Sequence, residues 1–149
     1  MRVPAPVLSA ESPDDTLANM RLVAFALCAL VVVGCRKDET LGAYGAADHI
    51  WVLQELDGVV FAERATLRIP EPGQITGDAP CNTYSGKMSA PYPWFETGPL
   101  AITRMACPDL AAETRFFAAL ETMTLSEVSG DTLILSNETG REMVFKDSD

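Results

Sequence analysis

An apolar run that ends at a cysteine limits which part of this chain can fold into a globular domain. The run extends from Leu22 to Gly34, follows Arg21, and ends in the order Val32-Val33-Gly34-Cys35. A positive start, a short apolar stretch and small residues before a cysteine are typical of a bacterial lipoprotein signal. We therefore expect residues 1–34 to be a leader that is removed, and Cys35 to carry a lipid.

Two structures other than a signal could account for this run. A transmembrane helix must cross about 30 Å of hydrocarbon, whereas this run would rise only about 20 Å at about 1.5 Å per residue. A buried helix of a domain would carry polar residues on one face, and this run carries none. The upstream residues 1–19 include Glu11, Asp14 and Asp15, where a signal has positive charge, so we expect translation to start at Met20.

The chain has four cysteines, and their positions favour one disulfide. Cys28 lies inside the apolar run and Cys35 would carry the lipid, which leaves Cys81 and Cys107 to pair in an oxidising compartment. Such a bridge would stabilise the fold by about 3 to 4 kcal/mol in the chain-entropy model. Two buried, unpaired thiols are the alternative. No Cys-x-x-Cys spacing indicates a redox-active pair.

Charge and composition limit the partners and the organisation of the rest of the chain. The net charge of −10 repels phosphate backbones, so we expect no nucleic-acid partner. Residues 35–48 are polar, small and Gly-containing, which predicts a flexible tether before a single domain over residues 49–149. The lipid on Cys35 makes the membrane a partner. Arg36 is not the aspartate that commonly signals inner-membrane retention, so we expect an outer-membrane anchor facing the periplasm.

Short stretches separated by turn residues predict a mainly antiparallel β domain with one helix, an α+β fold. Asp57-Gly58 and Asn137-Glu138-Thr139-Gly140 indicate two of the hairpin loops. Prolines at 91, 93 and 99 make any strand in the middle brief or place it at an edge. The expected strands cover residues 51–56, 59–61, 65–69, 74–76, 123–128, 132–136 and 141–146.

A helix is expected over about residues 109–122, with Pro108 at its first position. Five apolar residues gather on one side of this helix at 100° per residue and predict its core-facing stripe: Leu110, Phe116, Phe117, Leu120 and Met123. Glu113 falls inside the same arc. Its carboxylate either pairs with Arg104, just before the helix, or extends to solvent.

Two blocks in the middle of the domain are similar to a known family. The blocks are Cys81-Asn82-Thr83-Tyr84-Ser85-Gly86 and Thr103-Arg104-Met105-Ala106-Cys107. With Glu113 they resemble the META domain, also called the HslJ-like family, over about residues 50–146. The resemblance implies a small, strongly curved antiparallel sheet or partial barrel with one helix, often found behind lipoprotein signals. Pro80 departs from the family's usual glycine, and proline fixes φ and removes an amide donor at that position.

The resemblance also implies which positions are worth testing, although the family has no established molecular activity. These positions are Asn82, Tyr84, Thr103, Arg104 and Glu113. A structural role is favoured for them. Asn82 can brace a turn, Tyr84 can bury its ring while its hydroxyl bonds the backbone, and Arg104 can pair with Glu113.

Chemistry-bearing patterns are scarce, so we expect no catalytic residues, no metal and no cofactor. His49 is the only histidine, and no Ser-His-Asp or Cys-His arrangement is indicated. Cys81, Cys107 and one remote histidine do not make a tetrahedral zinc set. The chain also lacks a Gly-rich phosphate loop.

One aromatic cluster, formed by Tyr92, Trp94 and Phe95, lies outside the expected strands and helix. It would be a recognition patch if exposed and a plug for the end of the sheet if buried. The leading function is a non-enzymatic envelope lipoprotein domain that supports envelope integrity or stress tolerance through protein contacts. The alternatives are a binder of a small apolar ligand on a concave sheet face, and an inhibitor of a secreted hydrolase that uses residues 91–95.

Overall fold

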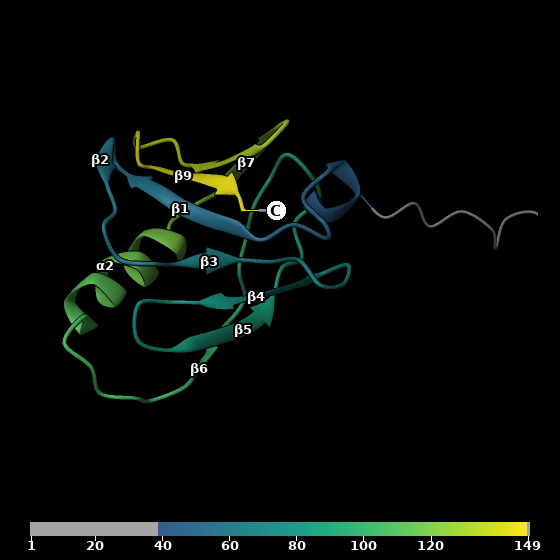
Figure 1. The fold of residues 1–149 in the computed structure, drawn as a ribbon. Helices are drawn as coiled ribbons and strands as arrows, with labels where there is room; N and C mark the ends of the chain where they lie inside the picture. The colour runs from purple at the N-terminus through teal and green to yellow at the C-terminus, as the bar shows by residue number, and fades with distance from the viewer. Residues whose placement is uncertain (1–38, 149) are drawn as a thin grey trace, which may run out of the picture. The chain divides into compact units, whose positions relative to one another are not determined.

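The structure, a computed structural model, describes residues 39–148 and contains two antiparallel sheets and one α-helix (Figure 1). The expected leader, the start at Met20 and the lipid site at Cys35 lie outside these residues. No helix among residues 39–148 is long and apolar enough to cross a membrane. The elements are η1 (Leu41–Tyr44), β1 (Trp51–Leu56), β2 (Val59–Val60), β3 (Thr66–Leu67), β4 (Gln74–Asp78), β5 (Thr83–Lys87), β6 (Ala101–Ile102), α2 (Leu110–Leu120), β7 (Leu125–Ser129), β8 (Thr132–Ser136) and β9 (Glu142–Asp147).

The larger sheet has the strand order β2-β1-β9-β8-β7, with β3 also pairing with β1. The smaller sheet has the order β4-β5-β6. An isolated bridge between Arg68 and Thr76 connects the end of β3 with β4, so the chain passes from one sheet to the other at this point (Figure 1). The predicted mainly β fold with one helix is confirmed. The sheets do not close, and two sheets replace the single curved one, so the term partial barrel fits only loosely.

The hairpins follow the turn residues of the sequence. Asp57 and Gly58 have φ values of 52° and 75°, the left-handed pair of a tight two-residue loop between β1 and β2. Arg141 bonds the Asp57 carboxylate through Nη2 at 2.9 Å and, with the backbone amide of Glu142, keeps the pKa of Asp57 below its usual value. This turn is thereby connected to the start of β9.

Strand β5 and the short β6 are absent from the sequence-based prediction. Only Tyr84 of β5 is buried, so the strand lacks the apolar alternation that marks a half-buried strand. Strand β4 also continues past its expected end through Gly77. A Cβ at residue 77 would overlap the Thr66 carbonyl and lie 2.8 Å from the Tyr84 ring, so only glycine permits this close approach.

The helix α2 packs most of the predicted stripe into the core. Phe116 and Leu120 are fully buried and Phe117 is nearly so, and Met123 lies buried just beyond the helix. Leu110 is 44% exposed, so its place in the stripe was wrong. It is the first residue of the helix, where the chain arrives from an exposed loop and not from the core.

The expected flexible tether over residues 35–48 is wrong from residue 41 onward. Leu41 and Ala46 are fully buried, and η1 forms a turn of 3-10 helix. The indole Nε1 of Trp51 donates to the Ala46 carbonyl at 3.0 Å, which fixes this segment to β1. The glycines and alanines on either side of Tyr44 therefore allow close packing here, whereas composition alone suggested mobility.

Candidate functional site

The family-like motif residues converge on one buried carboxylate. Glu113 projects from the first turn of α2, and its Oε2 accepts hydrogen bonds from the backbone amides of Cys81 at 3.0 Å and Asn82 at 2.8 Å. Its Oε1 accepts from the Asn82 Nδ2 at 2.7 Å. Glu113 is 6% exposed and Asn82 is 4% exposed. The carboxylate thus joins the helix to the loop between β4 and β5 through three charge-assisted bonds.

The Asn82 side chain extends this network to the loop between β6 and α2. Its Oδ1 accepts from the Met105 backbone amide at 2.6 Å and from the Thr103 hydroxyl at 2.9 Å. The Thr103 Oγ1 in turn accepts from the Thr83 amide at 3.1 Å. We call Glu113, Asn82 and Thr103 the carboxylate brace. Each polar side-chain atom of the brace has a hydrogen-bond partner within the domain.

Arg104 takes no part in this brace, which corrects the expected pairing with Glu113. The Arg104 side chain is exposed, and within residues 39–148 no ion pair connects it to Glu113. The alternative, a Glu113 side chain that extends to solvent, is also wrong because the residue is buried. Three N–H donors satisfy the carboxylate in place of a cation.

The predicted disulfide between Cys81 and Cys107 is present next to the brace. Their Cα atoms lie 5.9 Å apart, and the bridge joins the same two loops that Asn82 connects. Covalent and hydrogen-bonded links therefore act in parallel on the motif segments.

Removal of this disulfide provides a direct stability test. The double variant Cys81→Ser/Cys107→Ser is expected to lose about 3 kcal/mol of unfolding free energy, because the bridge no longer restricts a segment with a sequence separation of 26 in the unfolded chain. Urea unfolding of the domain measures the loss. Wild-type protein kept reduced should unfold at the midpoint of the double variant. Equal midpoints for oxidised wild type and the variant would exclude a stabilising bridge.

Tyr84 has an internal role similar to that of the brace. Its hydroxyl donates to the Thr66 carbonyl at 2.8 Å, which connects β5 with β3. The ring packs against Phe116 and Phe117, at centroid distances of 5.7 and 5.4 Å. Burial, assisted by the negative charge of Asp78, raises the pKa of Tyr84 far above its ordinary value. The hydroxyl therefore stays a protonated donor to the Thr66 carbonyl.

The side chains of the aromatic cluster at residues 92–95 differ in exposure. The cluster is therefore neither the fully exposed patch nor the fully buried plug that the sequence suggested. Phe95 is 2% exposed and Trp94 is 59% exposed. Tyr92 is half-buried and stacks on Tyr44 with ring centroids 4.4 Å apart. Backbone bonds attach the loop to β7 and the residue before it, with Phe95 N donating to Thr124 O at 2.9 Å and Ser126 N donating to Pro93 O at 2.7 Å. These backbone bonds brace the loop.

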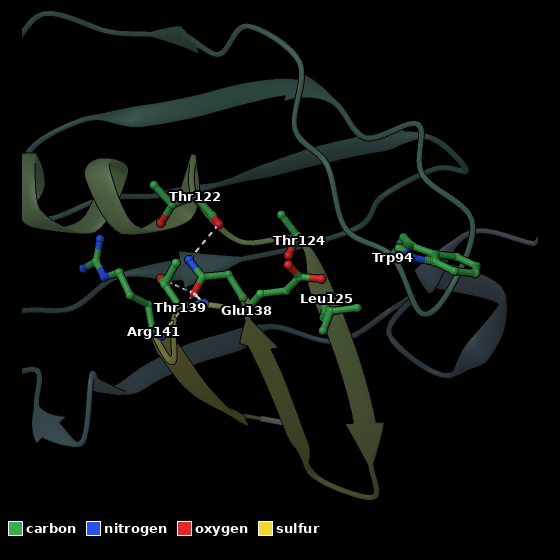
Figure 2. A pocket seen from close by; sticks show the side chains of 8 residues that line it. Trp94, Thr122, Thr124, Leu125, Glu138, Thr139 and Arg141 are labelled. Atoms are coloured by element: carbon green, nitrogen blue, oxygen red, sulfur yellow. Dashed lines mark hydrogen bonds between the residues drawn. The ribbon is translucent and has the colours of Figure 1, made fainter.

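A surface groove of about 590 Å³ begins at Trp94 and continues to the loop before β9. Figure 2 shows Trp94 at one end of the groove and Arg141 at the other. Its lining consists of Trp94, Thr122, Thr124, Leu125, Asn137, Glu138, Thr139 and Arg141. Two of the polar groups are already used, because Asn137 Nδ2 donates to the Thr122 carbonyl and Arg141 bonds Asp57. Apart from Trp94, no sequence pattern indicated this groove, because its lining comes from separate segments.

Neither the brace nor the groove holds a set of metal ligands. Among residues 39–148, no group of three His, Cys, Asp or Glu side chains could bind a metal ion. His49 Nδ1 lies 2.6 Å from the Asp147 Oδ2, a contact between the start of β1 and the end of β9. This contact connects the two ends of the domain.

These features define a small disulfide-braced α+β domain in which a buried glutamate connects two loops to one helix. The sequence profile of the META domain matches residues 45–149. The chain therefore belongs to the META domain family. The fold is also similar to a protein from Burkholderia xenovorans solved by NMR, at 24% identity and a TM-score of 0.58, over 72% of this chain and 86% of that one.

A second protein solved by NMR has the same fold, at 20% identity and a TM-score of 0.54. That match covers 68% of this chain and 90% of the other. A comparison with curated protein sequences finds no match. At these identities the solved structures establish the fold and leave the activity to be argued from the site.

Proposed function

We propose that this protein is a lipid-anchored domain of the bacterial cell envelope that acts through contacts with other envelope components and not through catalysis. The apolar run that ends at Cys35 supports the anchor. The disulfide between Cys81 and Cys107 suits an oxidising compartment. Membership of the META domain family supports a domain of this general kind.

The non-enzymatic part of the proposal rests on one observation: the motif side chains bond to groups inside the fold. A catalytic acid, base or nucleophile must reach its substrate. Glu113 and Asn82 are buried and bonded to each other, the Tyr84 hydroxyl bonds a backbone carbonyl, and both motif cysteines are oxidised. These residues stabilise a shape and leave the exposed surface to make contacts.

The anchor can be tested by the intact mass of the full chain purified from bacterial membranes. A diacylglyceryl adduct on a chain that begins at Cys35 is the expected result. Cys35→Ser should remove the adduct and release the protein from the membrane fraction. Cys28→Ser is the matched control, because it alters a cysteine of the apolar run and leaves Cys35 in place. An unmodified chain that retains residues 1–34 would contradict the proposal.

The proposed role in envelope integrity calls for a cellular assay. A strain that lacks the gene is expected to grow poorly under detergent or antibiotic stress on the envelope, and the full chain should restore growth. Cys35→Ser should fail to restore it while Cys28→Ser succeeds. Full restoration by Cys35→Ser would show that anchoring is dispensable for this role.

A further inference from the structure

We propose that the folded domain itself lies against the bilayer, through an aromatic surface formed by Tyr44, Tyr92 and Trp94. This inference rests on the proposed lipid at Cys35, and it adds a second, non-covalent contact between protein and membrane. The occupant of the surface is the interfacial region of a zwitterionic phospholipid bilayer. Three observations carry it: the position of the surface along the chain, its exposure, and its fixed backbone.

The Tyr44 and Tyr92 rings lie where the chain enters the domain, and Trp94 follows Tyr92 by two positions in the same loop. The Tyr92 amide donates to the Glu39 carbonyl at 2.8 Å, and the Tyr92 ring stacks on Tyr44. Glu39 follows Cys35 by four positions, which can span at most about 14 Å even when fully extended. Because Leu41 of η1 is fully buried in the core, the connection between lipid and domain is limited to this short segment. A lipid inserted in the bilayer therefore keeps this end of the domain near the interface.

The exposed side chains have the chemistry that membrane interfaces favour. Trp94 is 59% exposed and Tyr44 is 51% exposed. Tryptophan and tyrosine concentrate at bilayer interfaces, where the ring enters an apolar layer while the N–H or O–H remains hydrated. Trp94 also lines two grooves, each of about 590 Å³, so its ring is accessible from both.

The backbone presents Trp94 outward in a fixed position. Phe95 is buried directly after it, and Phe95 N donates to Thr124 O at 2.9 Å. On the other side, Ser126 N donates to Pro93 O at 2.7 Å. A ring on a fixed backbone loses less conformational freedom when it enters an interface than a ring on a mobile loop does.

The negative charge of the chain favours contact with a zwitterionic bilayer over an anionic one. The chain has a net charge of −10, and Glu39 and Glu96 are exposed next to the aromatic residues. An anionic surface would repel these carboxylates. A zwitterionic surface allows burial of the rings without that cost, so vesicles of phosphatidylcholine are the appropriate probe.

The test uses the full chain, purified with its lipid and reconstituted in phosphatidylcholine vesicles whose acyl chains carry bromine, a contact quencher of tryptophan. The chain has two tryptophans, and Trp51 is fully buried, so Trp94 reports on the membrane. We expect brominated lipid to remove most of the Trp94 emission, and unbrominated vesicles to shift its maximum to shorter wavelength. Trp94→Phe should abolish both effects.

A reporter on another part of the domain provides the matched control. Val60 is 76% exposed on β2, at the opposite edge of the larger sheet from β7, whose first residue bridges Trp94. In the variant Trp94→Phe/Val60→Trp, the new indole should stay unquenched by brominated lipid and accessible to aqueous acrylamide. Equal quenching at residues 60 and 94 would overturn an oriented contact.

Intact mass measured on the same sample separates the two proposals. A lipidated chain whose Trp94 stays accessible to acrylamide and unquenched by bromine overturns the docking and leaves the anchor intact. A chain with no adduct at Cys35 overturns the anchor and the docking together. A Trp94 that ignores lipid but responds to added peptidoglycan fragments would assign the aromatic surface to a glycan and also overturn the membrane contact.

Discussion

Replacement of Glu113 by alanine is expected to lower the free energy of unfolding by about 4 kcal/mol. The change removes the acceptor of three N–H groups, two from the backbone at Cys81 and Asn82 and one from the Asn82 side chain. Each buried donor left without a partner costs about 1 to 3 kcal/mol. Urea unfolding monitored by circular dichroism measures the loss. Glu121→Ala is the matched control, because Glu121 is exposed at the end of the same helix, and it should change stability by less than about 0.5 kcal/mol.

An exchange of the amide and the carboxylate tests the geometry if Glu113→Ala does not fold. Glu113→Gln alone turns an amide N–H₂ toward an existing donor, and Asn82→Asp alone places two carboxylates side by side. In the double variant Glu113→Gln/Asn82→Asp, the new amide donates to the new carboxylate, while the amide oxygen still accepts from the two backbone N–H groups. We expect the double variant to lose less unfolding free energy than the two single variants lose together, by about 1 kcal/mol or more. Simple additivity would show that the two side chains are not directly coupled.

Phe116→Ala is expected to cost about 3 to 5 kcal/mol, the second large effect. Phe116 is fully buried and packs with Phe117 and Tyr84, at centroid distances of 5.2 and 5.7 Å. Truncation would leave a cavity between α2 and the sheets that these rigid rings cannot fill. Thermal or urea unfolding of the variant gives the value.

Leu110→Ala supplies the comparison within the same helix. Leu110 is 44% exposed, so its truncation should cost less than about 1 kcal/mol. A loss at Leu110 as large as that at Phe116 would mean that the helix is rotated from the orientation described here.

The sequence predicted the fold where turn chemistry and apolar periodicity are local. Asp57-Gly58 specifies its hairpin because both residues adopt positive φ. The β8 bounds agree with the prediction because the apolar run Leu133-Ile134-Leu135 is bounded on both sides by turn residues. Strand β5 was missed because its pairing with β4, including Ile75 opposite Gly86, comes from tertiary structure and not from its own pattern. The same limit explains why residues 41–48 were expected to be a flexible tether, since Leu41 is buried in a core whose other members are distant in the sequence.

The sequence predicted which residues form the site, but not which groups they bond. Resemblance to the family indicated Asn82, Thr103 and Glu113, and these do form one network. The partner of Glu113 was expected to be Arg104, because a carboxylate in a core suggests a cation. The actual donors include two backbone amides, which every residue but proline carries. Such partners have no signature in the sequence and require the path of the chain.

The position of β9 affects when the domain can fold. This last strand lies between β1 and β8 in the larger sheet, and Asp147 pairs with Trp51. A nascent chain in which β9 is not yet available lacks an interior strand and leaves an edge of β1 and an edge of β8 unpaired. Completion of that sheet also requires contacts between the two ends of the domain, which form slowly. The larger sheet therefore cannot be completed until β9 is available to pair with both β1 and β8.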